Sequence, residues 1–147
     1  MNLKIYIANA FADNRFGGNP AAVVPLQKWL SETLMQQIAA QNNLAETAFI
    51  LAQDNDYAIR WFTPTVEVAL CGHATLAAAH IFFNHLGYKK KRICFHSKSG
   101  PLEVSKMDDD KIMLDFPAND PVPAESSDLI ERGLKRKPVE VYKSSFD

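Results

Sequence analysis

The chain has 147 residues, which is enough for one domain with its own hydrophobic core. Apolar residues make up 47% of it and charged residues 22%, as in ordinary globular proteins. The net charge is −1, the one basic cluster is Lys89 to Arg92, and no apolar stretch is long enough to cross a bilayer, so we expect neither a nucleic-acid nor a membrane partner.

The first half of the chain predicts strands and one helix. Leu3, Ile5 and Ile7 alternate with more polar residues, which predicts a half-buried strand. The elements expected next are a turn over 11–20, a short strand over 21–26 that Pro25 ends, a helix from Glu32 to about Gln41 capped by Ser31, and two strands over 45–52 and 57–64 joined by the turn 53–56.

Residues 72–86 predict a helix that is apolar almost all round and ends at Gly87. A helix of this kind is normally surrounded by protein, and the small residues Ala77 to Ala79 allow neighbouring strands to approach closely. We therefore expect a sheet wrapped around this helix.

Beyond this helix, the sequence predicts a three-stranded meander and then a change in composition. The strands are expected over 92–100, 101–107 and 111–117, with turns at Gly100–Pro101 and Asp108–Asp110. A proline-rich linker, a short helix over 127–134 and a strand with no visible partner follow. We expect an N-terminal domain over 1–118, and in 119–147 a linker, helix and first strand of a truncated second domain.

Cys71, Gly72 and His73 stand at the start of the apolar helix. The N–H groups of a first helical turn have no helical partners and carry about half a positive charge, so a carboxylate is stabilised there. Gly72 leaves room for a ligand, the helix start is expected to lower the pKa of the Cys71 thiol, and His73 can donate to an anion or move a proton. Taken singly, a cysteine and a histidine here are more often core residues; together they favour a site modestly.

Other candidate groups are weaker. His73 and His80 are about 10 Å apart along a helix, too far to share one ion, so no metal site is expected. Glu46 opens an apolar strand, where partial desolvation favours acid/base chemistry, but an exposed strand-end glutamate is at least an equal reading. Gly18 and Asn19 lie in a segment that is either a turn or a rim touching a ligand.

Four segments together resemble the phenazine-biosynthesis F-like family of isomerases, which has the diaminopimelate epimerase-like fold. They are FGGNPAAVV, NNLAETAFI, IRWFTPTVEVALCGHATLAAA and LDFPA, in this order and spacing. The resemblance implies an α+β fold of two similar domains, each a mixed β-sheet curled around a central α-helix, with the active site between them.

The same resemblance implies roles for individual residues. Glu46 matches the family's catalytic acid/base, and Gly72, His73, Gly18 and Asn19 match residues that bind the substrate. Related epimerases and racemase-like enzymes carry a catalytic cysteine just before the helix, which makes Cys71 a candidate acid/base. Family members are about twice as long as this chain and are often homodimers.

Three hypotheses follow from the sequence. The first is an isomerase or epimerase that acts on a small carboxylate substrate by proton transfer, with no cofactor and no metal. The second is a non-catalytic binding or scaffold domain that keeps the fold, and the third is an enzyme that uses the Cys71 thiol. The two cysteines lack C-x-x-C spacing and the first residues resemble a strand rather than a signal peptide, so we expect a reduced, cytoplasmic protein.

Overall fold

The computed structural model describes residues 2–14, 16–109 and 111–144. The chain divides into two compact units, Met1–Phe116 and Pro117–Asp147, and this boundary lies two residues before the one expected from the sequence. Among the described residues, no helix combines the length and the apolar character needed to span a membrane.

The first unit is built on one sheet whose strand order is β1-β2-β3-β4-β6-β7-β8, with β5 paired to β4. Pairing is parallel for β2–β3 and β4–β6 and antiparallel elsewhere. The strands are β1 (Tyr6–Ala10), β2 (Asn19–Leu26), β3 (Glu46–Gln53), β4 (Asp56–Phe62), β5 (Glu67–Val68), β6 (Arg92–Ser97), β7 (Gly100–Lys106) and β8 (Ile112–Asp115).

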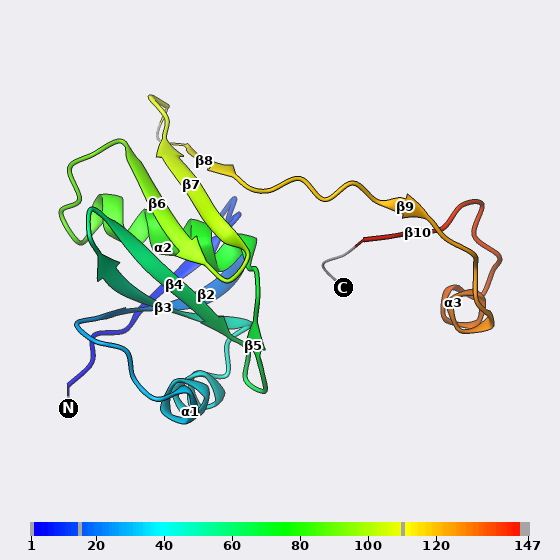
Figure 1. The fold of residues 1–147 in the computed structure, drawn as a ribbon, viewed down its shortest axis with the longest axis horizontal. Helices are drawn as coiled ribbons and strands as arrows, with labels where there is room; N and C mark the ends of the chain where they lie inside the picture. Colours follow the sequence, from blue (N-terminus) through cyan, green and yellow to red (C-terminus); the bar gives the residue numbers. More distant parts are fainter. Residues whose placement is uncertain (1, 15, 110, 145–147) are drawn as a thin grey trace. The chain divides into compact units, whose positions relative to one another are not determined.

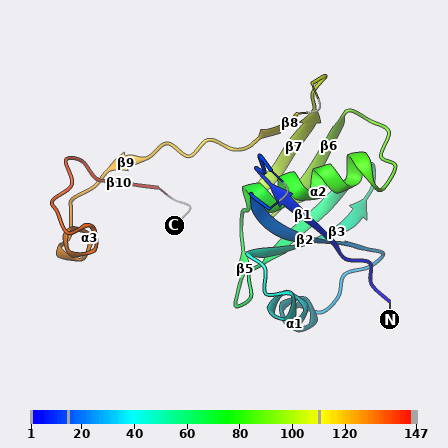
Figure 2. The ribbon, with the colours of Figure 1, turned by 180° about the vertical axis from the view of Figure 1, so that it is seen from behind.

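The sheet curls around helix α2 (Gly72–Asn84), which contacts β1, β2 and β3 on one side and β7 and β8 on the other (Figure 1). Helix α1 (Glu32–Asn42) covers the outer surface of the sheet at β3 and β4 (Figure 2). The expected α+β fold, a mixed sheet curled around a central helix, is confirmed.

Two separate cores explain these layers. The larger core packs the apolar helix α2 against inward side chains such as Trp61, Phe95 and Leu102. The smaller core packs Met35 and Ala39 of α1 against the outer side of the sheet, including Phe49. Because α2 is surrounded, seven of its thirteen residues are buried, which is why its sequence lacks a polar face.

The first strand does not use the face that its sequence pattern predicts. Ile5 lies outside β1, and Ile7 is 66% exposed, whereas Tyr6 and Ala8 pack against the core around α2. Antiparallel partners share a face, and Tyr6 is paired with Val23, which belongs to the core around α2, whereas Ala22, the partner of Ile7, does not. The alternation was therefore right in its period but wrong in which residues point inward.

Other predicted boundaries also shift. β2 continues through Pro25 to Leu26, because β1 begins only at Tyr6, opposite Val23, and proline is tolerated where one side of a strand is unpaired. Helix α2 ends at Asn84, two residues earlier than expected, and Gly87 with φ 69° turns the chain towards β6. Asp110 of the last predicted turn lies outside the described residues.

The second unit contains α3 (Asp128–Leu134) and two short strands, β9 (Val122–Pro123) and β10 (Tyr142–Lys143). Ser127 caps α3 by accepting a hydrogen bond from the Ile130 N–H at 3.4 Å. The C-terminal strand was expected to have no partner, and this was wrong: β10 pairs antiparallel with β9, inside the segment expected to be a linker. The strand was predicted over 138–146, and its residues 145 and 146 lie outside the described residues.

Candidate active site

The start of β3 and the start of α2 meet at one end of the sheet's strands. β2 and β3 run parallel, with Ala21 paired to Glu46, so both strands begin at this end. The antiparallel partner β1 ends there, where Ala10 is paired with Asn19. Glu46, Asn19 and the loop before Asn19 therefore lie at the same end of the sheet.

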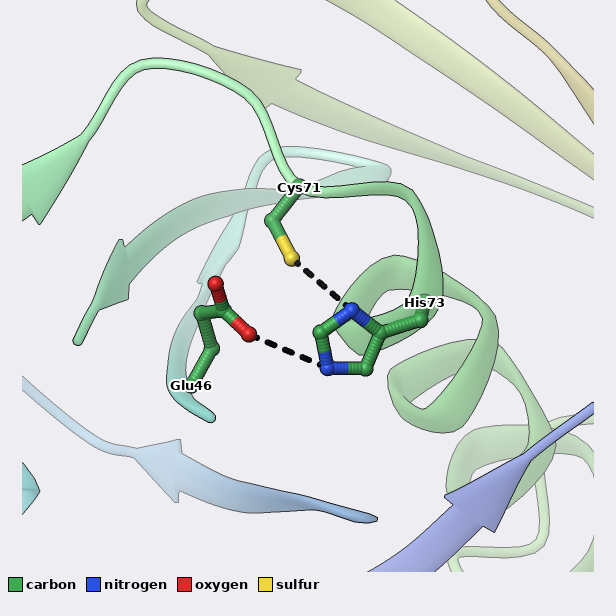
Figure 3. Close-up of side chains that lie close together, drawn as sticks. All are labelled: Glu46, Cys71 and His73. Atoms are coloured by element: carbon green, nitrogen blue, oxygen red, sulfur yellow. Dashed lines mark hydrogen bonds and ion pairs between the residues drawn. The ribbon is translucent and has the colours of Figure 1, made fainter. Parts of the chain in front are cut away.

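At this end of the strands, the side chains of Glu46, Cys71 and His73 lie close together (Figure 3). The imidazole of His73 lies between the other two side chains: its Nε2 is 3.1 Å from Glu46 Oε2, and its Nδ1 is 3.5 Å from Cys71 Sγ. The exposed fractions of the His73 and Glu46 side chains are 11% and 18%, and Cys71 is buried. The structure thus brings together a carboxyl, an imidazole and a thiol that the sequence separates by up to 27 residues.

The contact between Glu46 and His73 is close but is not a well-aligned hydrogen bond. Glu46 Oε2 and His73 Nε2 are both buried, and neither has a hydrogen-bond partner of good geometry. Most buried polar atoms in proteins are hydrogen-bonded, and a pair left in this state costs free energy. Two unsatisfied polar atoms that face each other are suited to a ligand that completes their bonds.

The thiol of Cys71 differs from its sequence prediction. Burial raises the pKa of Cys71 from 9.0 to about 12, and the nearby Glu46 carboxyl adds to the rise. The N–H groups of Ala74 and His73 at the start of α2 do act to lower this pKa, as expected, but they are outweighed. The prediction of a lowered thiol pKa was therefore wrong, because the same burial that surrounds α2 also removes the thiol from water.

The thiol of Cys71 has two neighbours that can accept its proton. It keeps this proton at neutral pH, and both His73 Nδ1, at 3.5 Å, and the Glu46 carboxyl lie within its reach. Where the S–H donates to Nδ1, a neutral imidazole carries its own proton on Nε2, the nitrogen that faces Glu46. The ligand atoms of the three groups lie within 4.8 Å of one another, so the groups form a compact cluster.

Two hydrogen bonds that sequence analysis did not single out hold this arrangement. The buried Thr75 Oγ1 donates to the Cys71 carbonyl at 2.6 Å, which fixes the residue that caps α2. Asn42 Nδ2 donates to the buried Thr47 Oγ1 at 3.2 Å, next to Glu46. A threonine four residues after a helix cap was the available signal for the first bond, whereas the second depends on tertiary structure.

The three remaining residues predicted to bind substrate differ in their backbone conformation, exposure and packing. Gly18 has φ 87°, and a Cβ there would lie 2.5 Å from the Ala10 carbonyl oxygen, so the backbone alone requires glycine. Asn19 is exposed at the first position of β2. A Cβ on Gly72 would meet only Phe116 Cε2, at an ordinary 3.6 Å, so packing does not require glycine at Gly72.

A separate hollow in the first unit lies away from these three residues. It is an open groove of about 960 Å³ along α2, lined by residues of β1 and by His80, Ile81, His85 and Ile112. Burial lowers the pKa of His80, and neighbouring charges on His85 and Lys106 add to this effect. Glu46, Cys71 and His73 do not line this groove.

The ligand atoms of Glu46, Cys71 and His73 lie within 4.8 Å of one another, which is close enough to hold a metal ion. The imidazole geometry is unfavourable, because the thiol and the carboxyl face opposite ring nitrogens and one ion can bind only one of them. The absence of a metal here stays a prediction from the sequence.

Comparison with known proteins gives consistent relatives. Residues 8–137 match the family model described as phenazine biosynthesis-like protein. An uncharacterized isomerase of Pseudomonas aeruginosa is 46% identical over 99% of this chain and 55% of its own length. The mouse phenazine biosynthesis-like domain-containing protein 1 is 40% identical over all of this chain and 54% of its own length.

Solved structures agree with the sequence relatives. A protein of the phenazine biosynthesis family from Enterococcus faecalis superposes with a TM-score of 0.83 at 46% identity, over 97% of this chain and 54% of its own. One from Clostridium difficile gives 0.81 at 40% identity, over 97% and 55%. The chain thus spans about half the length of these relatives. With its curled sheet, its central helix and these matches, the chain belongs to the phenazine biosynthesis-like protein family.

Proposed function

We propose that this chain carries the N-terminal half of an isomerase that moves a proton between carbon positions of a small carboxylate substrate. The observation that carries the proposal is the buried contact between Glu46 Oε2 and His73 Nε2, 3.1 Å apart at the N-terminus of α2. It places a proton acceptor beside a group of backbone N–H donors. Relatives named as isomerases support the same class of reaction.

In this proposal Glu46 is the base that removes a proton from carbon and returns it elsewhere. The electron pair left on the substrate is delocalised into its carboxylate or an adjacent double bond as an enolate-like charge. The N–H groups at the start of α2 and Nε2–H of His73 stabilise that charge, which lowers the barrier to proton removal. No cofactor is needed for such a step, because Glu46 keeps the proton within the site.

Cys71 acts in this scheme through His73. Its raised pKa keeps it as a neutral thiol, which is a poor base and a poor nucleophile. In this scheme its S–H donates towards His73 Nδ1, which leaves the imidazole proton on Nε2, on the side of Glu46 and the substrate. We therefore favour a positioning role for Cys71 over the thiol chemistry that the sequence left open.

Uptake of solvent deuterium tests the proposal. The protein, expressed with whatever its coding region specifies beyond Asp147, is incubated in deuterated water with small carboxylates that carry an acidic C–H bond. Mass spectrometry then measures deuterium in the recovered substrate. We expect uptake in the unmodified protein and a loss of about 10²–10⁴-fold in Glu46→Gln, the usual contribution of a general base.

The exposed Glu125→Gln is the matched control, because it makes the same chemical change far along the chain and should retain full uptake. Equal uptake in Glu46→Gln and the control would refute the role of Glu46. A protein that binds these carboxylates without any exchange would favour the binding or scaffold hypothesis.

A further inference from the structure

A second cluster of metal-ligating side chains lies on the outer face of the sheet. Asp56 opens β4, and Cys94 and His96 belong to the parallel neighbour β6. The register pairs Tyr57 with Phe95, both of which face the core, so their neighbours along each strand point to the opposite face. The His96 and Asp56 side chains are 46% and 40% exposed, so an ion from solvent can reach them.

The three ligand atoms are already close to the arrangement of a tetrahedral site. His96 Nε2 lies 3.7 Å from Asp56 Oδ2 and 4.0 Å from Cys94 Sγ, and all three atoms lie within 4.8 Å of one another. Tetrahedral Zn²⁺ with ordinary bond lengths would separate nitrogen from oxygen by about 3.3 Å and nitrogen from sulfur by about 3.5 Å. The nitrogen–oxygen and nitrogen–sulfur distances therefore need to shorten by only about half an ångström for binding.

This geometry differs from that of Glu46, Cys71 and His73. In the outer cluster the carboxylate and the thiol both approach the same nitrogen, Nε2 of His96, so one ion can sit between all three. At His73 the two partners face opposite ring nitrogens. The outer cluster is the better chelate of the two groups found among the described residues.

The local charge also favours a cation. Glu103 of β7 is paired with Cys94 across the sheet and adds a second carboxylate next to the thiol. Arg92 contacts Glu103 at 3.1 Å and offsets part of this charge. A divalent cation would compensate the remainder and allow the thiol to ionise.

We propose that Asp56, Cys94 and His96 form a binding site for a borderline-soft divalent cation such as Zn²⁺, which bridges β4 and β6. The bridge lies at a weak junction of the sheet. Among the described residues, two residue pairs join β4 to β6, whereas six join β6 to β7. A metal held by both strands would reinforce this short parallel junction, so its binding stabilises the folded chain by linkage.

Titration with Co²⁺ alone tests the site, because a cobalt–thiolate bond gives a charge-transfer absorption in the near ultraviolet. The experiment uses Cys71→Ser as the background, so that Cys94 is the remaining thiol. We expect one Co²⁺ per chain with this absorption, its displacement by Zn²⁺, and a rise in the melting temperature when Zn²⁺ is added. Asp56→Asn and His96→Gln should each weaken binding at least ~10-fold.

Cys94→Ser in the same background should abolish the absorption and remove the rise in melting temperature. Retained absorption in that variant, or no cobalt–thiolate absorption in the background protein, would overturn the proposal. Asp56→Asn and His96→Gln that both bind as tightly as the background would also overturn it, since they would show that the thiol binds metal alone. Unfolding of each metal-free variant in urea confirms that its fold is intact.

Discussion

The raised pKa of Cys71 predicts an unusually unreactive thiol. With a pKa of about 12, about one molecule in 10⁴ carries the thiolate at pH 8, which is about 10³-fold fewer than for a thiol of ordinary pKa. In a Cys94→Ser background, alkylation by iodoacetamide should therefore be slow at pH 8. Its rate should still rise about tenfold per pH unit at pH 10, where an ordinary thiol has reached its plateau.

Substitution of Glu46 separates the causes of this shift. Burial is the first cause of the raised pKa and the Glu46 carboxyl is a further one, so Glu46→Gln should lower the pKa and speed alkylation, while Glu125→Gln should not. A rate that levels off near pH 9, or equal rates in Glu46→Gln and the control, would refute the reasoning about Cys71.

The same shift predicts how stability depends on pH. The pKa of Cys71 is higher in the folded state, so the protonated thiol stabilises the fold fully below about pH 8.5, and this stabilisation is lost as pH rises towards 12. Between pH 8 and pH 10 the loss is about 1.4 kcal/mol. Urea unfolding should show that Cys71→Ser loses less stability over this interval than the unmodified chain; equal losses would contradict the pKa assignment.

Three further predictions concern a close backbone approach, an ion pair and a buried hydrogen bond of the first unit. Gly18→Ala should lower the free energy of unfolding in urea by more than ~2 kcal/mol, because strain from the positive φ adds to an overlap of the new Cβ with the Ala10 carbonyl oxygen. Gly100→Ala is the control: its φ is 99° but its surroundings are open, so it should cost only ~1–2 kcal/mol. Equal costs would contradict the close approach at Gly18. Arg60 donates a hydrogen bond to Glu67 and lowers the pKa of that carboxyl, so the pair stabilises the fold above about pH 4.5 and stabilises it less as the pH falls. Arg60→Gln should therefore make the free energy of unfolding depend less on pH in this acid range. An unchanged midpoint of acid unfolding would contradict the role of this pair. Thr75→Val removes the hydroxyl that donates to the carbonyl before α2 and should cost about 1 kcal/mol; a neutral effect in urea unfolding would show that this bond is unimportant.

Sequence patterns predicted the central helix and its surroundings well, since hydrophobicity on all sides of residues 72–84 has few structural explanations. The same patterns failed where a partner decides the outcome. Whether Ile7 or Tyr6 faces the core depends on the register with β2, which local alternation cannot specify. The pairing of β10 with a segment of prolines likewise depends on chain folding rather than on local preference.

The candidate site was predictable in its members but not in its electrostatics. Resemblance to the family pointed to Glu46 and His73, and the structure brings them together. The thiol pKa of Cys71 is set by a competition between the helix N-terminus and burial, and the degree of burial is visible only in the folded chain. Homodimer formation, a cytoplasmic location and a small carboxylate substrate stay predictions.

The most direct test of the central claim is an amide NMR titration with a small carboxylate such as acetate at constant ionic strength. If the start of α2 and the unsatisfied pair of Glu46 and His73 form an anion-binding acid/base site, the amides of Gly72, His73 and Ala74 should shift together and saturate. Shifts confined to other parts of the chain, with these three amides unmoved at saturation, would contradict it.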